Sequence, residues 1–160
     1  RPTAHPMHDM QNTLFATHDI QPFEPYRSEA LRHLELSLDQ LASHAFAELW
    51  VNHIQFPALC ALINVSRGCG FLMALRYDGD AGFTTRSGAS SGNREGRIEY
   101  LLGNGQLDTY PISWALPTDA VVAALRHFAR TTRVPDELCW HNDSDDGLST
   151  PNDSGFVVPE

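Results

Sequence analysis

Eight histidines are the side chains of this sequence with the widest chemical range, because imidazole can bind a metal ion or move a proton near neutral pH. A protein metal site also needs its ligands at set spacings, and the sequence has neither a His-Glu-x-x-His pair nor a Cys-x-x-Cys pair. We therefore predict no metal site and no cofactor. His5 and His8 lie in an expected N-terminal arm, and the histidines that we interpret as isolated side chains are His33, His44, His53 and His127.

Three other segments contain residues suited to nucleotide or metal binding but lack the rest of the pattern. Gly103-Asn104-Gly105 starts like a dinucleotide fingerprint, but the third glycine is missing and no helix is expected to follow. Residues 88–94 are rich in glycine and serine but have no phosphate-binding lysine, and residues 143–147 lack the closing glutamate of a calcium loop. The nucleophile elbow and the zinc-deaminase signature are also missing. We therefore predict that the protein is not an enzyme.

The chain is strongly acidic, with a formal net charge of −9 over 160 residues. An acidic surface repels nucleic acid and anionic membranes, so neither is expected as a direct partner. Two interpretations of the acidity stay open: it favours solubility, or it matches a basic partner such as a nucleic-acid-acting protein. All 11 cationic side chains are arginines, which excludes mechanisms that need a lysine, such as phosphate-loop and Schiff-base chemistry.

Composition predicts one domain in a reducing, cytoplasmic environment. A chain of 160 residues is long enough to bury a core without crosslinks. No apolar run approaches the ~20 residues of a membrane span, and the first residues lack the apolar stretch of a signal peptide. Cys60, Cys69 and Cys139 are an odd number without close spacing, so we expect reduced thiols.

The clearest secondary-structure pattern is a helix from Thr118 to Thr131, which lies between strands. Its apolar residues recur at helical spacing and include Phe128. Thr118 is expected to cap the N-terminus, and Pro135 helps to end the helix. A short strand that carries Trp140 follows. We expect Phe128 and Trp140 to be buried and Pro135 to have a structural role.

These elements predict an α+β fold in a single domain, with the 118–131 helix packed on a mostly antiparallel sheet and a shorter helix near the N-terminus. Proline-rich residues 1–27 are assigned to an extended arm and residues 28–141 to the domain. Residues 142–160 are acidic and poor in apolar side chains, and we assign them to a disordered tail. The other predicted strands cover residues 46–53, 56–65, 71–77, 83–85, 97–102 and 107–112.

Residues 31–45 allow two interpretations. Leucines and alanine recur at three-four spacing, which favours one amphipathic helix. Alternatively, His33 to Leu36 forms a strand, and Ser37 with Gln40 forms a capping box that opens a short helix. Periodicity favours the first interpretation and capping favours the second.

An acidic turn is the strongest candidate for a partner-binding surface. Asp78 and Asp80 flank a glycine, and an aromatic residue and a small polar loop follow. An acidic sheet edge with an exposed aromatic side chain suits protein binding, whereas a solvated hairpin end is the alternative. The residues assigned to this candidate surface are Tyr77, Asp78, Asp80, Phe83, Arg86, Asn93 and Glu95.

Several short motifs follow one another in an informative order. Phe56-Pro57-Ala58-Leu59 leads a strand, and residues 82–88 (GFTTRSG) precede another strand. The long helix ends in residues 127–132 (HFARTT), and residues 133–140 (RVPDELCW) close the segment. This arrangement resembles the Immunity protein 1 family of bacterial polymorphic toxin systems, most specifically in the aromatic-ended helix followed by a Pro-x-x-Leu-x-Trp strand. The resemblance covers roughly Leu31 to Trp140.

The resemblance implies an immunity protein that has no catalytic residues and blocks the active site or substrate groove of the toxin domain encoded beside it. The loop before Ile98 resembles that of members which neutralise DNA-targeting deaminase toxins, so a deaminase is the implied partner. Pro135 and Trp140 are implied to be structural, and the strand-then-helix interpretation of residues 31–44 is favoured. The alternatives are a non-catalytic adaptor without a toxin partner and a small enzyme of another type.

Overall fold

The computed structural model describes residues 13–88 and 95–154. Within these ranges the chain forms a large sheet, a separate hairpin and two long helices. In chain order the elements are β1 (Thr13–Ile20), α2 (Tyr26–Gln40), the 3-10 helix η1 (Leu41–Ser43), β2 (Phe46–His53), β3 (Ala58–Asn64), β4 (Cys69–Leu75), β5 (Phe83–Arg86), β6 (Arg97–Leu101), β7 (Leu107–Pro111), the 3-10 helix η3 (Ile112–Trp114), β8 (Leu116–Pro117), α3 (Thr118–Thr131), β9 (Cys139–Asn142) and the 3-10 helix η4 (Pro151–Ser154).

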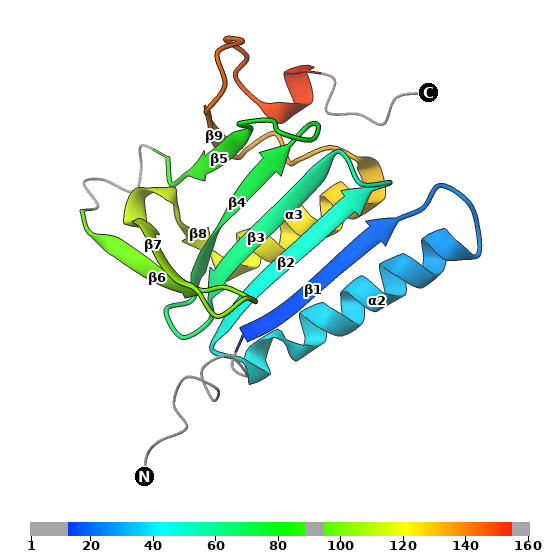
Figure 1. Cartoon of the computed structure of the whole chain (residues 1–160), viewed down its shortest axis with the longest axis horizontal. Coiled ribbons are helices and arrows are strands. Elements are labelled where there is room, and N and C mark those ends of the chain that lie inside the picture. Colours follow the sequence, from blue (N-terminus) through cyan, green and yellow to red (C-terminus); the bar gives the residue numbers. More distant parts are fainter. Residues whose placement is uncertain (1–12, 89–94, 155–160) are drawn as a thin grey trace.

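The main sheet has the strand order β1-β2-β3-β4-β5-β9, and the short strand β8 also pairs with β4. Every pairing in it is antiparallel except that of β1 with β2, which is parallel (Figure 1). The parallel pair is possible because α2 and η1 connect the two strands, whereas a tight turn joins only antiparallel neighbours. The predicted α+β fold with a mostly antiparallel sheet is confirmed.

One face of the main sheet packs against the helices. α3 crosses behind the sheet in Figure 1, and α2 runs beside β1. Their apolar side chains meet those of alternate residues of the strands in a single core. The core includes Leu34 and Leu38 from α2, Leu49 and Ile63 from the sheet, and Leu125 and Phe128 from α3.

The opposite face of the sheet carries a second core beneath the β6–β7 hairpin. Phe71 of β4 lies at its centre, with the rings of Tyr100, Tyr110 and Trp114 at centroid distances of 5.3, 4.7 and 5.4 Å. Hydrogen bonding also joins the hairpin to the main sheet: Thr13 Oγ1 of β1 donates to the Leu101 carbonyl of β6 at 3.0 Å. The hairpin is therefore held by both apolar packing and hydrogen bonds.

α3 has the predicted bounds of Thr118 and Thr131. Phe128 is fully buried, as expected, whereas Trp140 is half-buried against the edge of the core. The expectation that the Thr118 side chain caps the helix was wrong: Pro117 is the N-cap, and there is no side-chain capping bond. Thr132 ends the helix in the left-handed conformation and donates its N–H to the Phe128 carbonyl at 2.9 Å.

The strand-then-helix interpretation of residues 31–44 was wrong, because α2 is continuous from Tyr26 to Gln40. The expectation of a shorter N-terminal helix was also wrong, since α2 has 15 residues and α3 has 14. The buried leucines 34, 38 and 41 follow the helical period that the sequence displays. Ser37, the expected cap, is instead within hydrogen-bonding distance of β1, with its Oγ 2.9 Å from His18 Nε2. The Ser37 side chain, which suggested the start of a helix, therefore forms a tertiary contact instead.

The proposed boundaries at residues 27 and 142 do not separate the domain from flanking segments. Residues 13–20 of the assigned arm form β1, whose Leu14 and Ile20 lie in the core, and α2 already begins at Tyr26. Residues 143–154 of the assigned tail pack on the domain, with Leu148 against the core. Residues 1–12 and 155–160 of these segments lie outside the described residues.

Candidate functional site

Four connections lie together at one end of the main sheet, which we call the loop end. The strand registers place them there: Ile20 at the end of β1 pairs with His53 at the end of β2, and Ala58 at the start of β3 pairs with Leu75 at the end of β4. Phe83 at the start of β5 pairs with Asn142 at the end of β9. The β1–α2 loop, the β2–β3 turn, the β4–β5 loop and the segment after β9 therefore share this end (Figure 1).

The last two of these connections form an acidic corner, defined here as residues 76–82 and 143–148. It contains five carboxylates and one arginine. The two segments are joined by backbone and side-chain contacts, because Asp143 donates its N–H to the Gly82 carbonyl at 2.8 Å and Thr84 Oγ1 donates to Asp143 Oδ2 at 3.1 Å. The corner is thus one surface built from two distant parts of the sequence.

Arg76 holds the acidic corner together. Its Nε and Nη2 donate to the two oxygens of Asp80 at 2.7 and 2.8 Å, and it also donates to Asp146 and Ser144. Burial opposes ionisation of Asp80, but the hydrogen bonds from Arg76 outweigh it and keep the pKa of Asp80 below its ordinary value. The same guanidinium lowers the pKa of Asp146. Both carboxylates are therefore charged at neutral pH.

Two residues assigned to the binding surface are buried, which corrects the expectation that they are exposed. The Asp80 side chain has no exposed surface and serves as the partner of Arg76. Phe83 is also fully buried in the core, with the Arg76 guanidinium 5.0 Å from its ring centroid. In this structure neither side chain is available to a partner, and both stabilise the corner from inside.

Tyr77 and Asp78 are exposed at the tip of the β4–β5 loop, where the sequence placed them. Tyr77 is 56% exposed and lies beside Arg76, whose guanidinium carbon is 5.6 Å from the ring centroid. The turn is closed by a hydrogen bond from the Asp80 N–H to the Tyr77 carbonyl at 3.1 Å. The corner therefore presents an aromatic side chain on a loop that an internal ion pair fixes.

The other assigned residues do not join this surface. Arg86 lies at the far end of β5, where its guanidinium is 4.5 Å from the ring centroid of Trp114 and donates to Thr84 Oγ1 at 2.9 Å. Glu95 is exposed just before β6, and Asn93 lies outside the described residues. The structure thus brings together only Tyr77 and Asp78 of the exposed candidates, and it places Arg86 and Glu95 elsewhere.

Sequence reasoning missed the contribution of Asp143, Asp145 and Asp146. Their composition suggested a disordered tail, because nothing local indicates that Arg76 lies next to them. The run Asp143-Ser144-Asp145-Asp146-Gly147 did stand out as a calcium-like loop, and that dense acidic pattern was the available signal. In the structure, one carboxylate of this run, that of Asp146, forms an ion pair with Arg76.

The loop end also carries several exposed apolar side chains. Phe23 is 75% exposed, Tyr26 62% and Ile54 49%. Ile54 has a φ of 51°, a conformation that a β-branched residue rarely adopts. Together with Tyr77 they present large apolar side chains at the end of the sheet where the acidic corner lies, and aromatic side chains are enriched in protein interfaces.

Within the described ranges, no group of three or more histidine, cysteine, aspartate or glutamate side chains is placed to hold a metal ion. Across the hairpin, Cys60 lies opposite Met73 and Cys69 lies opposite Asn64, so these two thiols do not face each other. None of the described helices combines the length and apolar character that crossing a membrane requires.

The family model of immunity protein Imm1 matches residues 16–142 of the chain. The chain belongs to the Imm1 family. The match begins within β1 and extends into β9, so it includes a strand that the motif resemblance did not cover. Among curated proteins, none matches the chain.

Membership of the Imm1 family identifies the kind of partner. The family consists of immunity proteins, which implies a cognate toxin as the binding partner and indicates a non-enzymatic role. A protein of this kind acts through its surface, and we consider the loop end with its acidic corner as the candidate binding surface.

Proposed function

We propose that this Imm1 protein neutralises a basic, nucleic-acid-acting toxin, such as a deaminase, by one-to-one binding that covers the toxin's active site. Family membership supplies the toxin partner. The acidic corner is the observation that supports a basic, nucleic-acid-acting toxin, because toxins that act on nucleic acid need a basic surface to bind phosphates. A carboxylate-rich surface on the immunity protein complements such a surface and competes with the nucleic acid for it.

The exposed part of the corner suits this role. Asp78 and Asp145 are exposed, and no described residue forms an ion pair with either. Asp80 and Asp146 are ion-paired with Arg76, so they fix the loop rather than attract a partner. Exposed charges such as those of Asp78 and Asp145 speed encounter with a partner, whereas an aromatic anchor at the centre of an interface slows dissociation. Tyr77 is our candidate anchor, with Ile54 and Phe23 extending the apolar contact along the loop end.

Reversing the two exposed charges should slow association with the toxin. We expect the Asp78→Arg/Asp145→Arg variant to associate about tenfold or more slowly at low salt, because electrostatic steering contributes at least that much to strongly complementary pairs. Its dissociation rate should change less, and its association rate should depend less on salt. Stopped-flow or surface-plasmon-resonance kinetics at several salt concentrations measure all three quantities.

The matched control is Glu95→Arg/Glu99→Arg. It makes the same change in net charge on exposed residues just before and within β6, away from the loop end. Asp80 is left intact, because its reversal would break a buried ion pair. Equal slowing in the control would show that only net charge matters, and an unchanged rate in the corner variant would place the interface elsewhere.

A further inference from the structure

A groove of about 570 Å³ lies between α2 and α3, far from the acidic corner. It is formed by the last turn of α2, the 3-10 helix η1, the first turns of α3 and the β3–β4 turn, which contains Gly68. These segments lie at the opposite end of the main sheet from the loop end. Asn64 at the end of β3 pairs with Cys69 at the start of β4 there, whereas Ala58 pairs with Leu75 at the loop end. Its volume falls within the roughly 300–1,000 Å³ of pockets that take small ligands or several side chains.

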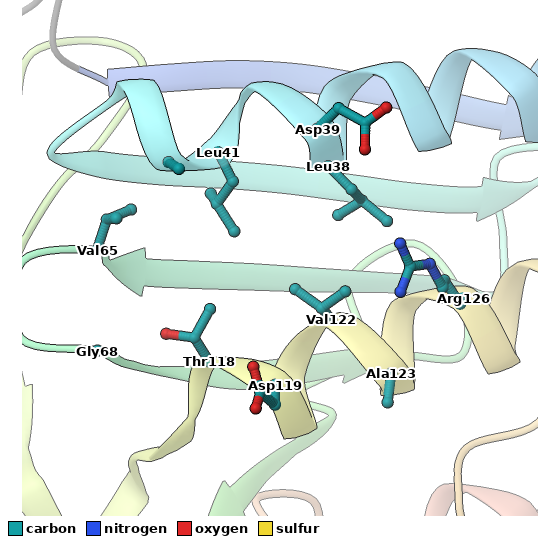
Figure 2. Close-up of a pocket in the computed structure, with 11 residues that line it drawn as sticks. Leu38, Asp39, Leu41, Val65, Gly68, Thr118, Asp119, Val122, Ala123 and Arg126 are labelled. Atoms are coloured by element: carbon teal, nitrogen blue, oxygen red, sulfur yellow. The ribbon is translucent and has the colours of Figure 1, made fainter.

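The inside of the groove is apolar. In Figure 2, Leu38 points from α2, Leu41 from η1 and Val122 from α3 into the space between the helices. Val65 lies at the end of the groove beside the β3–β4 turn. An open apolar channel between two helices is the form of surface that takes the apolar side of another peptide segment.

The charged groups around the groove are mostly acidic. Arg126 stands between the helices at one end (Figure 2), where its Nη2 donates to Glu35 Oε1 at 2.8 Å and its Nε donates to Glu35 Oε2 at 2.9 Å. That arginine is therefore already neutralised. Asp39 on α2 and Asp119 on α3 are both exposed, and neither forms an ion pair with another described residue.

We propose that this groove binds a short amphipathic segment of a partner protein that presents aliphatic side chains next to lysine or arginine. The aliphatic side chains would enter between Leu38, Leu41 and Val122. The cations would pair with Asp39 and Asp119, one on each helix. The carboxylates disfavour acidic segments and nucleic acid at this site. The proposal does not rest on the toxin, because the groove and the acidic corner lie at opposite ends of the sheet.

A peptide titration of the full-length ¹⁵N-labelled protein, followed by NMR, tests the proposal. The probe is a ten-residue blocked peptide of leucine and lysine arranged for an amphipathic helix. Two matched peptides replace all lysines with glutamate or all leucines with serine. We expect saturable amide shifts centred on residues 38–42, 65–68 and 118–126 with the leucine-lysine peptide, and much weaker shifts with the other two.

The Asp39→Asn/Asp119→Asn variant should bind the probe about fivefold or more weakly, which is within the range of two surface ion pairs. Glu29→Gln/Glu99→Gln removes the same charge outside the groove and should bind normally. The amide spectrum of each variant without peptide shows whether its fold is intact. Shifts centred on residues 76–82 and 143–148, equal binding of the glutamate peptide, or unchanged affinity of the Asp39/Asp119 variant would each overturn the proposal.

Discussion

Replacing Phe128 with alanine should lower the free energy of unfolding by ~3–5 kcal/mol, the usual cost of removing a buried aromatic side chain from a core that relaxes only in part. Phe128 has no exposed surface. Its ring meets that of His53 edge-on at a centroid distance of 4.9 Å. The His53 Nε2 lies 2.8 Å from the Phe128 carbonyl, so the same residue joins α3 to β2 through both its backbone and its side chain. Urea denaturation followed by circular dichroism measures the change.

Phe23→Ala is the matched control for this prediction, because it makes the same substitution at a side chain that is 75% exposed. Surface substitutions of this kind usually change stability by no more than about 0.5 kcal/mol. A Phe128→Ala variant as stable as the Phe23→Ala variant would contradict the described packing of α3 on the sheet.

The second large effect is expected from Arg76→Ala. This change leaves the carboxylate of Asp80 buried without its guanidinium partner, and breaking a buried pair in this way typically costs about 3–5 kcal/mol. The side chains of Arg76 and Asp80 are only 8% and 0% exposed, so water cannot readily replace the lost bonds. Denaturation at pH 7 should show the loss. Asp78→Ala in the same loop should show little change, because Asp78 is exposed.

The pH dependence of this effect has a defined sign. Although burial opposes it, pairing with Arg76 keeps the pKa of Asp80 below its ordinary value in the folded protein. The pair therefore stabilises the fold fully above the ordinary carboxyl range near pH ~4, and that contribution is lost as the pH falls through the lower folded pKa. The stability difference between the original protein and Arg76→Ala should shrink below that range. A difference that stays constant down to pH ~2 would contradict the role assigned to the pair.

The elements with strong local patterns could be predicted from the sequence. α3 has an apolar stripe of one clear period, an acidic first turn and an arginine in its last turn, and its bounds agree with the structure. The strands that form β2, β3 and β4 were also expected, because apolar runs separated by turn residues mark them. In these segments local preference and tertiary packing favour the same conformation.

Where distant contacts decide, the sequence was less informative. β1 pairs in parallel with β2 across an intervening helix, and its neighbouring prolines suggested an arm. Its alternating residues, with Leu14 and Ile20 on the core side, were a usable signal of a strand. The Ser37 and Gln40 pair matched a capping box by spacing alone, but the Ser37 hydroxyl lies against His18. In the first case a strand remote in sequence determines the conformation, whereas in the second the leucine periodicity already favoured the continuous helix.

The residues of the candidate site also fall into two groups: those that local sequence identified and those that only the tertiary structure identifies. Tyr77 and Asp78 were found because an acidic turn between strands is a local feature. Whether Asp80 and Phe83 face outward depends on Arg76 and the core, and whether Asp145 and Asp146 join them depends on the path of the chain after β9. Exposure and proximity are tertiary properties, so sequence supplied the acidic turn but not the whole surface.

The most direct test of the proposed function is a titration of the purified chain into its cognate toxin domain, with toxin activity on nucleic acid as the measured quantity. One-to-one occlusion predicts that toxin activity falls linearly with the amount of immunity protein added and reaches zero at one equivalent. Activity that persists at several equivalents would contradict the proposal. Complete loss at a small fraction of one equivalent would contradict it as well, since it would indicate catalytic inactivation instead of binding.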